Sequence, residues 1–105
     1  MPLKNIQDEV DKWTSQFTPQ YWPPYEILAR LTEEIGELAR EVNHLYGTKK
    51  KKDGEQENSL GQELTDIIFT VVCMANSQGI DLSKEWGKMV DKKLYGRDNN
   101  RFAKK

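Results

Sequence analysis

The chain has 105 residues, of which 36% are hydrophobic and 31% charged, and this predicts one small domain, residues 1–105, that buries further surface by self-association. The net charge of −1 excludes a broad basic field for nucleic acid, and no apolar run approaches the roughly 20 residues that a membrane span needs. The single cysteine, Cys73, excludes an internal disulfide framework and, with no signal-peptide pattern at the start, predicts a cytoplasmic protein.

Four apolar residues near the start of the chain recur at helical spacing. They are Ile6, Val10, Trp13 and Phe17, separated by four, three and four residues. We therefore expect a first helix from about Asn5 to Phe17. The segment TPQYWPP follows, and its prolines interrupt regular structure. Trp22, within this segment, is a candidate to flank the base of a ligand, because aromatic side chains stack on bases. The alternative is a role in the core or an interface.

A long second helix is expected over Pro24–Tyr46, because proline suits the first helical turn and Gly47 suits the C-terminal stop. Glu33, Glu34 and Glu37 fall within one arc beside its apolar stripe, at about 100° per residue. Like charges at helical spacing repel each other. Either this arc is a solvated face, or a cation from outside the chain neutralises it.

A charged loop, residues 47–58, comes next and contains four consecutive lysines, Lys49 to Lys52. We interpret it as a solvated loop rather than a phosphate-binding patch, because acidic residues follow at once. Ser59 and Gln62 then form the pattern of a capping box, which predicts the start of a third helix. This helix should end at Gly79. It is apolar on nearly all sides between residues 67 and 75, which is typical of a buried helix.

The last predicted helix begins after Asp81, a capping residue, and stops near Gly96. A basic tail, residues 97–105, follows it. No strand pattern is present, so the fold class is all-α, a four-helix chain that packs as a small bundle.

A second pair of acids, Glu63 and Asp66, lies three residues apart on one side of the third helix. Apolar neighbours flank Asp66, so we expect it to be buried. No Lys or Arg lies within a turn of either acid, and a buried carboxylate must be protonated, paired or bound to metal. If the second and third helices pack antiparallel, five carboxylates converge with no base among them. Oxygen-only ligation suits Mg²⁺ or Mn²⁺ rather than zinc. The alternative is that the acids are ordinary surface residues.

Two other chemistries are weaker alternatives. Glu41 and His44 form E-x-x-H, an element of di-iron bundles, but such a site needs two copies and His44 is the only histidine. Cys73 has no histidine or other base beside it in the sequence to activate its thiol, which favours a buried, inert side chain over a nucleophile.

Segments 33–37 (EEIGE) and 63–66 (ELTD), with 25 residues between them, resemble the E-E-x-x-E…E-x-x-D signature of MazG-like nucleoside triphosphate pyrophosphohydrolases. The segments VCMAN and KLYGR, farther along, agree with this resemblance, which is to the short, single-domain bacterial branch of that all-α superfamily. It implies a helical bundle completed by dimerisation, often as a dimer of dimers. It also implies hydrolysis of (deoxy)nucleoside triphosphates to the monophosphate and pyrophosphate, a house-cleaning activity on nucleotide pools.

The resemblance also implies roles for individual residues. Glu34, Glu37, Glu63 and Asp66 match Mg²⁺ ligands of the catalytic site, with Mn²⁺ as a substitute, and Glu33 matches an acid that activates water. Lys93 and Arg97 match phosphate-binding residues, and Asn76 matches a position that contacts the nucleoside. Alternatives in the same superfamily are a dUTP diphosphatase and the phosphoribosyl-ATP pyrophosphohydrolase of histidine synthesis. The alternative without catalysis is a helical interaction module.

Overall fold

The computed structural model describes residues 2–47 and 59–105, and all regular structure in these ranges is helical. The prediction of an all-α, four-helix chain is therefore confirmed. Lys49 to Lys52 and most of the charged loop lie outside the described residues. The elements are α1 (Leu3–Thr14), α2 (Pro24–Tyr46), α3 (Leu60–Ser77), α4 (Leu82–Met89) and η1 (Val90–Arg97), the last being a π-helix that continues α4.

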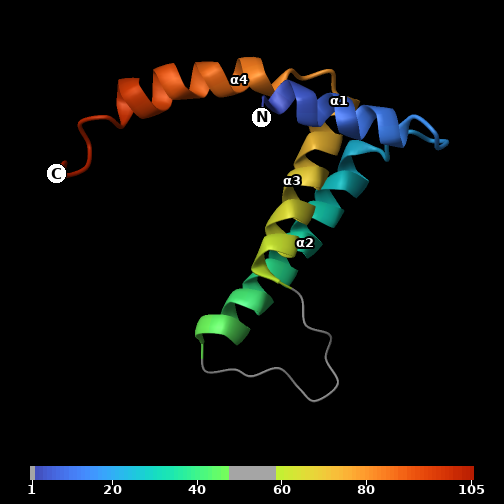
Figure 1. Ribbon diagram of the computed structural model, residues 1–105, viewed down its shortest axis with the longest axis horizontal. Helices are drawn as coiled ribbons and strands as arrows, with labels where there is room; N and C mark the ends of the chain where they lie inside the picture. The colour runs from blue at the N-terminus through green and yellow to red at the C-terminus, as the bar shows by residue number, and fades with distance from the viewer. Residues whose placement is uncertain (1, 48–58) are drawn as a thin grey trace.

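Helices α2 and α3 pack side by side in opposite directions and form a stalk, which is the packing that brings the two acidic motifs together (Figure 1). Helix α1 crosses one end of this stalk, where it contacts α3 and α4. From there α4 and η1 project away as an arm on one side of the stalk, and α1 extends past the stalk on the other side; the extents of the molecule are 50 × 46 × 26 Å.

Local chemistry fixes most of the helix ends. Pro24 stands in the first turn of α2, and Gly47 caps its C-terminal end. The capping box of α3 is present: the Gln62 backbone N–H donates to Ser59 Oγ, and the Ser59 N–H donates to Gln62 Oε1, both at 2.9 Å. Gly79, with φ of 68°, provides the left-handed turn after α3.

Helix α1 ends three residues earlier than predicted, at Thr14 rather than Phe17. The hydroxyls of Thr14 and Ser15 donate to the backbone carbonyls of Val10 and Lys12. Such local side-chain bonds compete with continuation of a helix. Phe17 therefore lies in the turn after α1, where its ring packs edge-on against Trp13 with 5.0 Å between the ring centroids.

The prediction of one α-helix from Asp81 to Gly96 is wrong in its second half. The backbone widens at Val90 into π-helical turns, and the Asp98 N–H donates to the Lys93 carbonyl, five residues back, at 2.8 Å. A Cβ atom at position 96 would lie 2.9 Å from the Asp91 carbonyl oxygen, so glycine permits this close approach. Apolar spacing in the sequence could not reveal the change of helix type.

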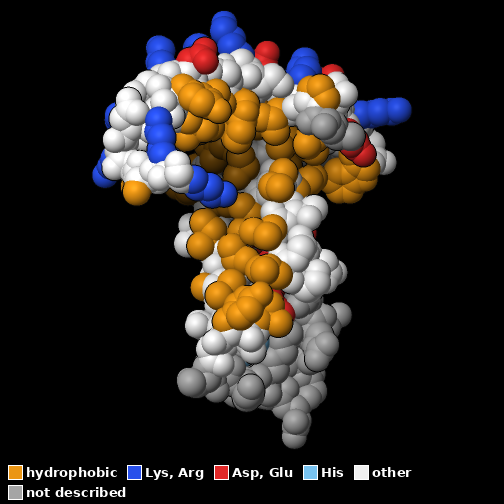
Figure 2. All heavy atoms as spheres, turned by 60° about the vertical axis from the view of Figure 1, so that its left-hand side comes forward, with side chains coloured by type: hydrophobic (Ala, Val, Ile, Leu, Met, Phe, Trp, Pro, Cys, Tyr) orange, Lys and Arg blue, Asp and Glu red, His pale blue; other side chains and the backbone are white. Residues whose placement is uncertain are grey.

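The core within one chain is small. Its buried hydrophobic residues, among those described, are Val10, Ile27, Val72 and Ala75. Several apolar residues of α3 are exposed instead, including Leu64, Ile68, Phe69 and Val71. Figure 2 shows hydrophobic side chains gathered along the stalk and beneath the crossing helices. Within one chain, the other described helices therefore leave much of the apolar surface of α3 uncovered. None of the described helices has the length and apolar character that crossing a membrane demands.

Candidate active site

Three glutamates from the two helices of the stalk form a compact acidic cluster. Glu34 and Glu37 lie three residues apart on α2, and Glu63 stands in the first turn of α3. Each offers a carboxylate oxygen, and these oxygens all lie within 4.8 Å of one another. The antiparallel packing of α2 and α3 thus joins the two acidic motifs that the sequence separates.

Two members of the acidic cluster are almost completely buried. The exposed fraction is 3% for both Glu34 and Glu63, whereas Glu37 is exposed. Glu34 Oε2 and Glu63 Oε2 are buried and accept no hydrogen bond from the described residues. An unpaired buried carboxylate oxygen is costly, because it loses water without gaining a partner. These two atoms therefore have the free coordination capacity that a cation needs.

Arg30 is the basic partner that the sequence analysis missed. Its Nε lies 2.8 Å from Glu34 Oε1, and its Nη1 lies 3.4 Å from Glu33 Oε2. The statement that no base accompanies the acids is therefore wrong for α2. The signal was present in the sequence, because a residue four positions before Glu34 lies on the same side of the helix.

The cluster also disfavours the charged form of Glu63. Burial is the largest cause of the raised pKa of this carboxyl group, and the negative charges of Glu37, Asp66, Glu34 and Glu41 raise it further. A nearby cation would oppose these effects by favouring the ionised form.

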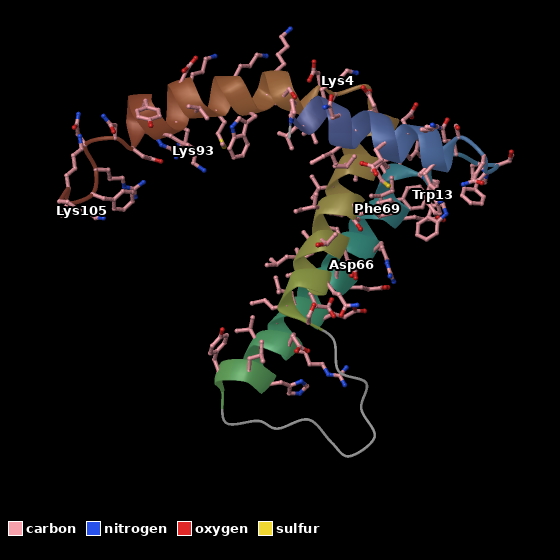
Figure 3. The ribbon with its side chains drawn as sticks, in the orientation of Figure 1. Lys4, Trp13, Asp66, Phe69, Lys93 and Lys105 are labelled. Atoms are coloured by element: carbon pink, nitrogen blue, oxygen red, sulfur yellow. The ribbon has the colours of Figure 1, made fainter. Side chains whose placement is uncertain are left out.

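Glu33 and Asp66 lie at the edge of the site rather than in the cluster. Glu33 is exposed and pairs with Arg30. Asp66 lies one turn after Glu63 and is also exposed, so the prediction that it is buried is wrong. Its apolar neighbours in the sequence, Leu64 and Ile68, are themselves exposed on this chain. Figure 3 labels Asp66 on α3.

An aromatic pocket of about 390 Å³ lies beyond the cluster, between α1, the proline-rich segment, α2 and α3. Its aromatic lining is Trp13, Phe17, Tyr21, Trp22 and Phe69. The rings of Trp13 and Phe69 meet edge-on with centroids 6.1 Å apart, and both are labelled in Figure 3. Arg30 and Thr70 also line the pocket. Because Arg30 contacts Glu34, the pocket adjoins the acidic cluster on α2, and on α3 Thr70 lies one turn after Asp66, at the edge of the site.

Comparison with known proteins shows the family of the chain. Residues 23–102 match the family model of the MazG nucleotide pyrophosphohydrolase domain. The chain belongs to the MazG family. It is 46% identical over 103 residues to YpjD of Bacillus subtilis strain 168, a protein described as uncharacterized, covering 98% of this chain and 92% of YpjD.

Two solved structures share the fold of this MazG chain. The crystal structure of Bacillus subtilis YpjD has a TM-score of 0.78 at 46% identity, over 89% of this chain and 95% of that one. A MazG protein conserved in Bacillus, described as a nucleotide pyrophosphohydrolase, has a TM-score of 0.74 at 44% identity, over 88% of both chains. The resemblance inferred from the two acidic motifs is therefore confirmed at the level of the family.

The remaining residues predicted from the MazG signature lie apart from the acidic cluster. Asn76 is bonded to Gln7 and Tyr21, at the end of α3 beneath α1. Lys93 and Arg97 lie on η1, in the arm that projects away from the stalk, and Figure 3 shows Lys93 far along this arm from Asp66. Arg97 pairs with its neighbour Asp98 at 3.0 Å. Within one chain, neither basic residue is brought to the acidic cluster.

His44 and Cys73 do not join the acidic cluster either. His44 is half-buried near the C-terminal end of α2, and it belongs to no group of potential metal ligands found among the described residues. Cys73 is half-buried and lines the aromatic pocket, where burial raises the pKa of its thiol. The expectation that this thiol is poorly activated agrees with that direction.

Proposed function

We propose that this MazG chain hydrolyses (deoxy)nucleoside triphosphates to the monophosphate and pyrophosphate with the help of Mg²⁺, and that it acts on nucleotide pools as a house-cleaning enzyme. The observation that carries the proposal is the pair of buried, unpartnered oxygens, Glu34 Oε2 and Glu63 Oε2, beside an aromatic pocket. Such oxygens suit a hard cation, and an apolar pocket lined by aromatic side chains suits a flat nucleobase.

The donor set fits Mg²⁺, with Mn²⁺ as a substitute. Every candidate ligand is a carboxylate, namely Glu34, Glu37, Glu63 and the adjacent Asp66, and hard divalent cations favour oxygen. When bound, the ion would offset negative charge on the phosphate oxygens of the substrate.

Side chains of the chain itself would position the base and the attacking water. Trp22, together with the other aromatic side chains of the pocket, would hold the base by stacking. Glu33 is exposed beside the cluster, so its carboxylate has access to solvent and can accept a proton from the attacking water. Asn76 would act on the nucleoside indirectly, because its side-chain amide is already bonded to Gln7 and Tyr21.

A second copy of the chain would complete the site, as a homodimer or a dimer of dimers. The small core and the exposed apolar side chains of α3 support this part of the proposal. Lys93 and Arg97 lie on a projecting arm, which would place them near the acidic cluster of a neighbouring copy rather than their own. There they would hold the terminal phosphates. The predicted absence of nucleic-acid and membrane partners, and the cytoplasmic location, stay predictions.

The test is a survey of nucleoside triphosphates with product analysis. Purified protein is incubated with Mg²⁺ and each of the common and modified ribo- and deoxyribonucleoside triphosphates, and with phosphoribosyl-ATP. We expect a monophosphate and pyrophosphate in equal amounts. Activity restricted to dUTP or to phosphoribosyl-ATP would favour one of the two specialised alternatives. Release of orthophosphate alone would contradict the proposal, and no turnover of any substrate would favour a helical interaction module.

A further inference from the structure

Arg30 stands at the junction between the aromatic pocket and the acidic cluster. Its side chain lines the pocket together with Trp13 and Trp22. Its Nε lies 2.8 Å from Oε1 of the buried Glu34. The Arg30 side chain therefore borders both the space proposed for the base and the carboxylates proposed for the metal.

No other charged side chain lines the aromatic pocket among the residues that the structure describes. The basic residues of the MazG signature, Lys93 and Arg97, are on the arm, and the Arg97 guanidinium is engaged by Asp98. A nucleotide that spans from pocket to cluster would thus meet one cation of its own chain on the way, and that cation is Arg30.

The Arg30 guanidinium has N–H donors that remain available to a ligand. Nε and Nη1 face Glu34 and Glu33, whereas Nη2 has no partner among the described residues. The Arg30 side chain is half exposed, at 48%, so a ligand can reach it. The planar fork of arginine matches a phosphate, and its charge persists at all working pH values.

We propose that Arg30 binds the phosphate attached directly to the nucleoside while its Nε retains Glu34 Oε1. The pairing would leave Glu34 Oε2 available to the cation. This inference rests on the proposed function, because it assumes a base in the pocket and phosphates at the cluster. It assigns the binding of the phosphate nearest the nucleoside to Arg30 of the same chain. Arg30 is not part of the family signature.

The experiment compares deoxynucleosides with their 5′-monophosphates at saturating Mg²⁺, so that the acidic cluster is neutralised. Binding is followed by the intrinsic fluorescence of Trp13 and Trp22, which line the pocket. The measured quantity is the ratio of the two dissociation constants, nucleoside over monophosphate. We expect Arg30→Gln to lower this ratio by about 10- to 100-fold, the value of one charge-assisted contact. Arg30→Lys keeps the charge without the fork and should give an intermediate ratio.

Lys12→Gln is the matched control, because it removes the same charge from the exposed side of α1 and should leave the ratio unchanged. An unchanged ratio in Arg30→Gln would overturn the proposal and leave Arg30 as the partner of Glu34 alone. An equal loss of affinity for nucleoside and monophosphate would overturn the proposal too, because Arg30 would then maintain the shape of the pocket rather than bind the phosphate. The binding ratio requires no turnover, so failure of the hydrolase proposal would be seen separately, in the product analysis.

Discussion

Asn76 and Gln7 exchange hydrogen bonds across 69 residues of sequence, which ties the end of α3 to α1. Gln7 Nε2 donates to Asn76 Oδ1 at 2.9 Å, and Asn76 Nδ2 donates to the Gln7 backbone carbonyl at 3.0 Å. Asn76 Nδ2 also donates to Tyr21 Oη, whose hydroxyl donates to Asp11. This network fixes the proline-rich segment that forms one wall of the aromatic pocket.

We therefore expect Asn76→Ala to weaken the fold as well as substrate binding. Gln7 is 6% exposed, and its Nε2 and Oε1 keep their bonds to Ile80 and Leu82. Removing Asn76 therefore leaves one buried Nε2 N–H unsatisfied, at a cost of about 1–3 kcal/mol. KM should rise while kcat changes little, because the pocket wall moves and the acidic cluster does not. Chemical denaturation measures the change in stability, and steady-state kinetics measure KM and kcat. Asn5→Ala, on the exposed side of α1, is the control. A variant as stable as the parent would show that Asn76 serves the substrate directly.

Neutralising one acid of the site should separate catalysis from stability. Glu63→Gln and Asp66→Asn are nearly isosteric and remove repulsion from the cluster, so the metal-free fold should be as stable or slightly more stable. Turnover should fall by at least about 100-fold, by analogy with the loss of one preorganised electrostatic group. Glu9→Gln on α1 should change neither quantity. Pyrophosphate release at the parental rate from both variants would mean that these acids are ordinary surface or structural residues.

The stability of the metal-free protein should depend on the ionisation of Glu63. Its pKa is raised above the ordinary 4.5, first by burial and then by the neighbouring acids. As the pH rises from that value to the folded-state pKa, the unfolded chain loses a proton that the folded chain still holds. The free energy of unfolding contributed by Glu63 therefore falls through this window and stays low above it. Melting curves in EDTA should show that Glu63→Gln gains stability relative to the parent with rising pH. A pH-independent difference would contradict the buried placement of this carboxylate.

The metal prediction distinguishes the carboxylate site from a di-iron site. We expect activity with Mg²⁺ or Mn²⁺ and no stoichiometric iron or zinc in the purified protein, because the cluster offers only oxygen ligands. Elemental analysis and activity after chelation test both parts, and His44→Ala should behave as the parent does. Stoichiometric iron that disappears in His44→Ala would instead support the Glu41 and His44 alternative.

Self-association should depend on the exposed apolar face of α3. Leu64, Ile68 and Val71 are spaced by four and three residues and are 46%, 50% and 38% exposed. A charge on this face opposes its burial in an interface, so Ile68→Asp should shift the protein toward monomers and reduce activity. Lys12→Asp on α1 is the control. Sedimentation velocity at micromolar concentration measures the effect, and a parent protein that is a stable, active monomer would disprove the assembly.

The sequence by itself determined the helical elements and the two acidic motifs. Pro24 and Gly47 set the ends of α2, and the Ser59–Gln62 capping box set the start of α3, because these signals act within a few residues. Helical period also placed Arg30 beside Glu34, although the pairing was overlooked. It could not foresee the π-helical turns after Met89, because apolar spacing does not encode the close approach of Gly96 to the Asp91 carbonyl oxygen within them.

Only the tertiary structure decided which groups meet. The rotation of α2 against α3 buries Glu34 and Glu63 together and leaves Glu33 and Asp66 at the edge. The aromatic pocket exists because segments far apart in the sequence converge at one end of the stalk. Helical period fixes the direction of a side chain relative to its own helix axis, whereas burial depends on how the neighbouring helices are placed around it.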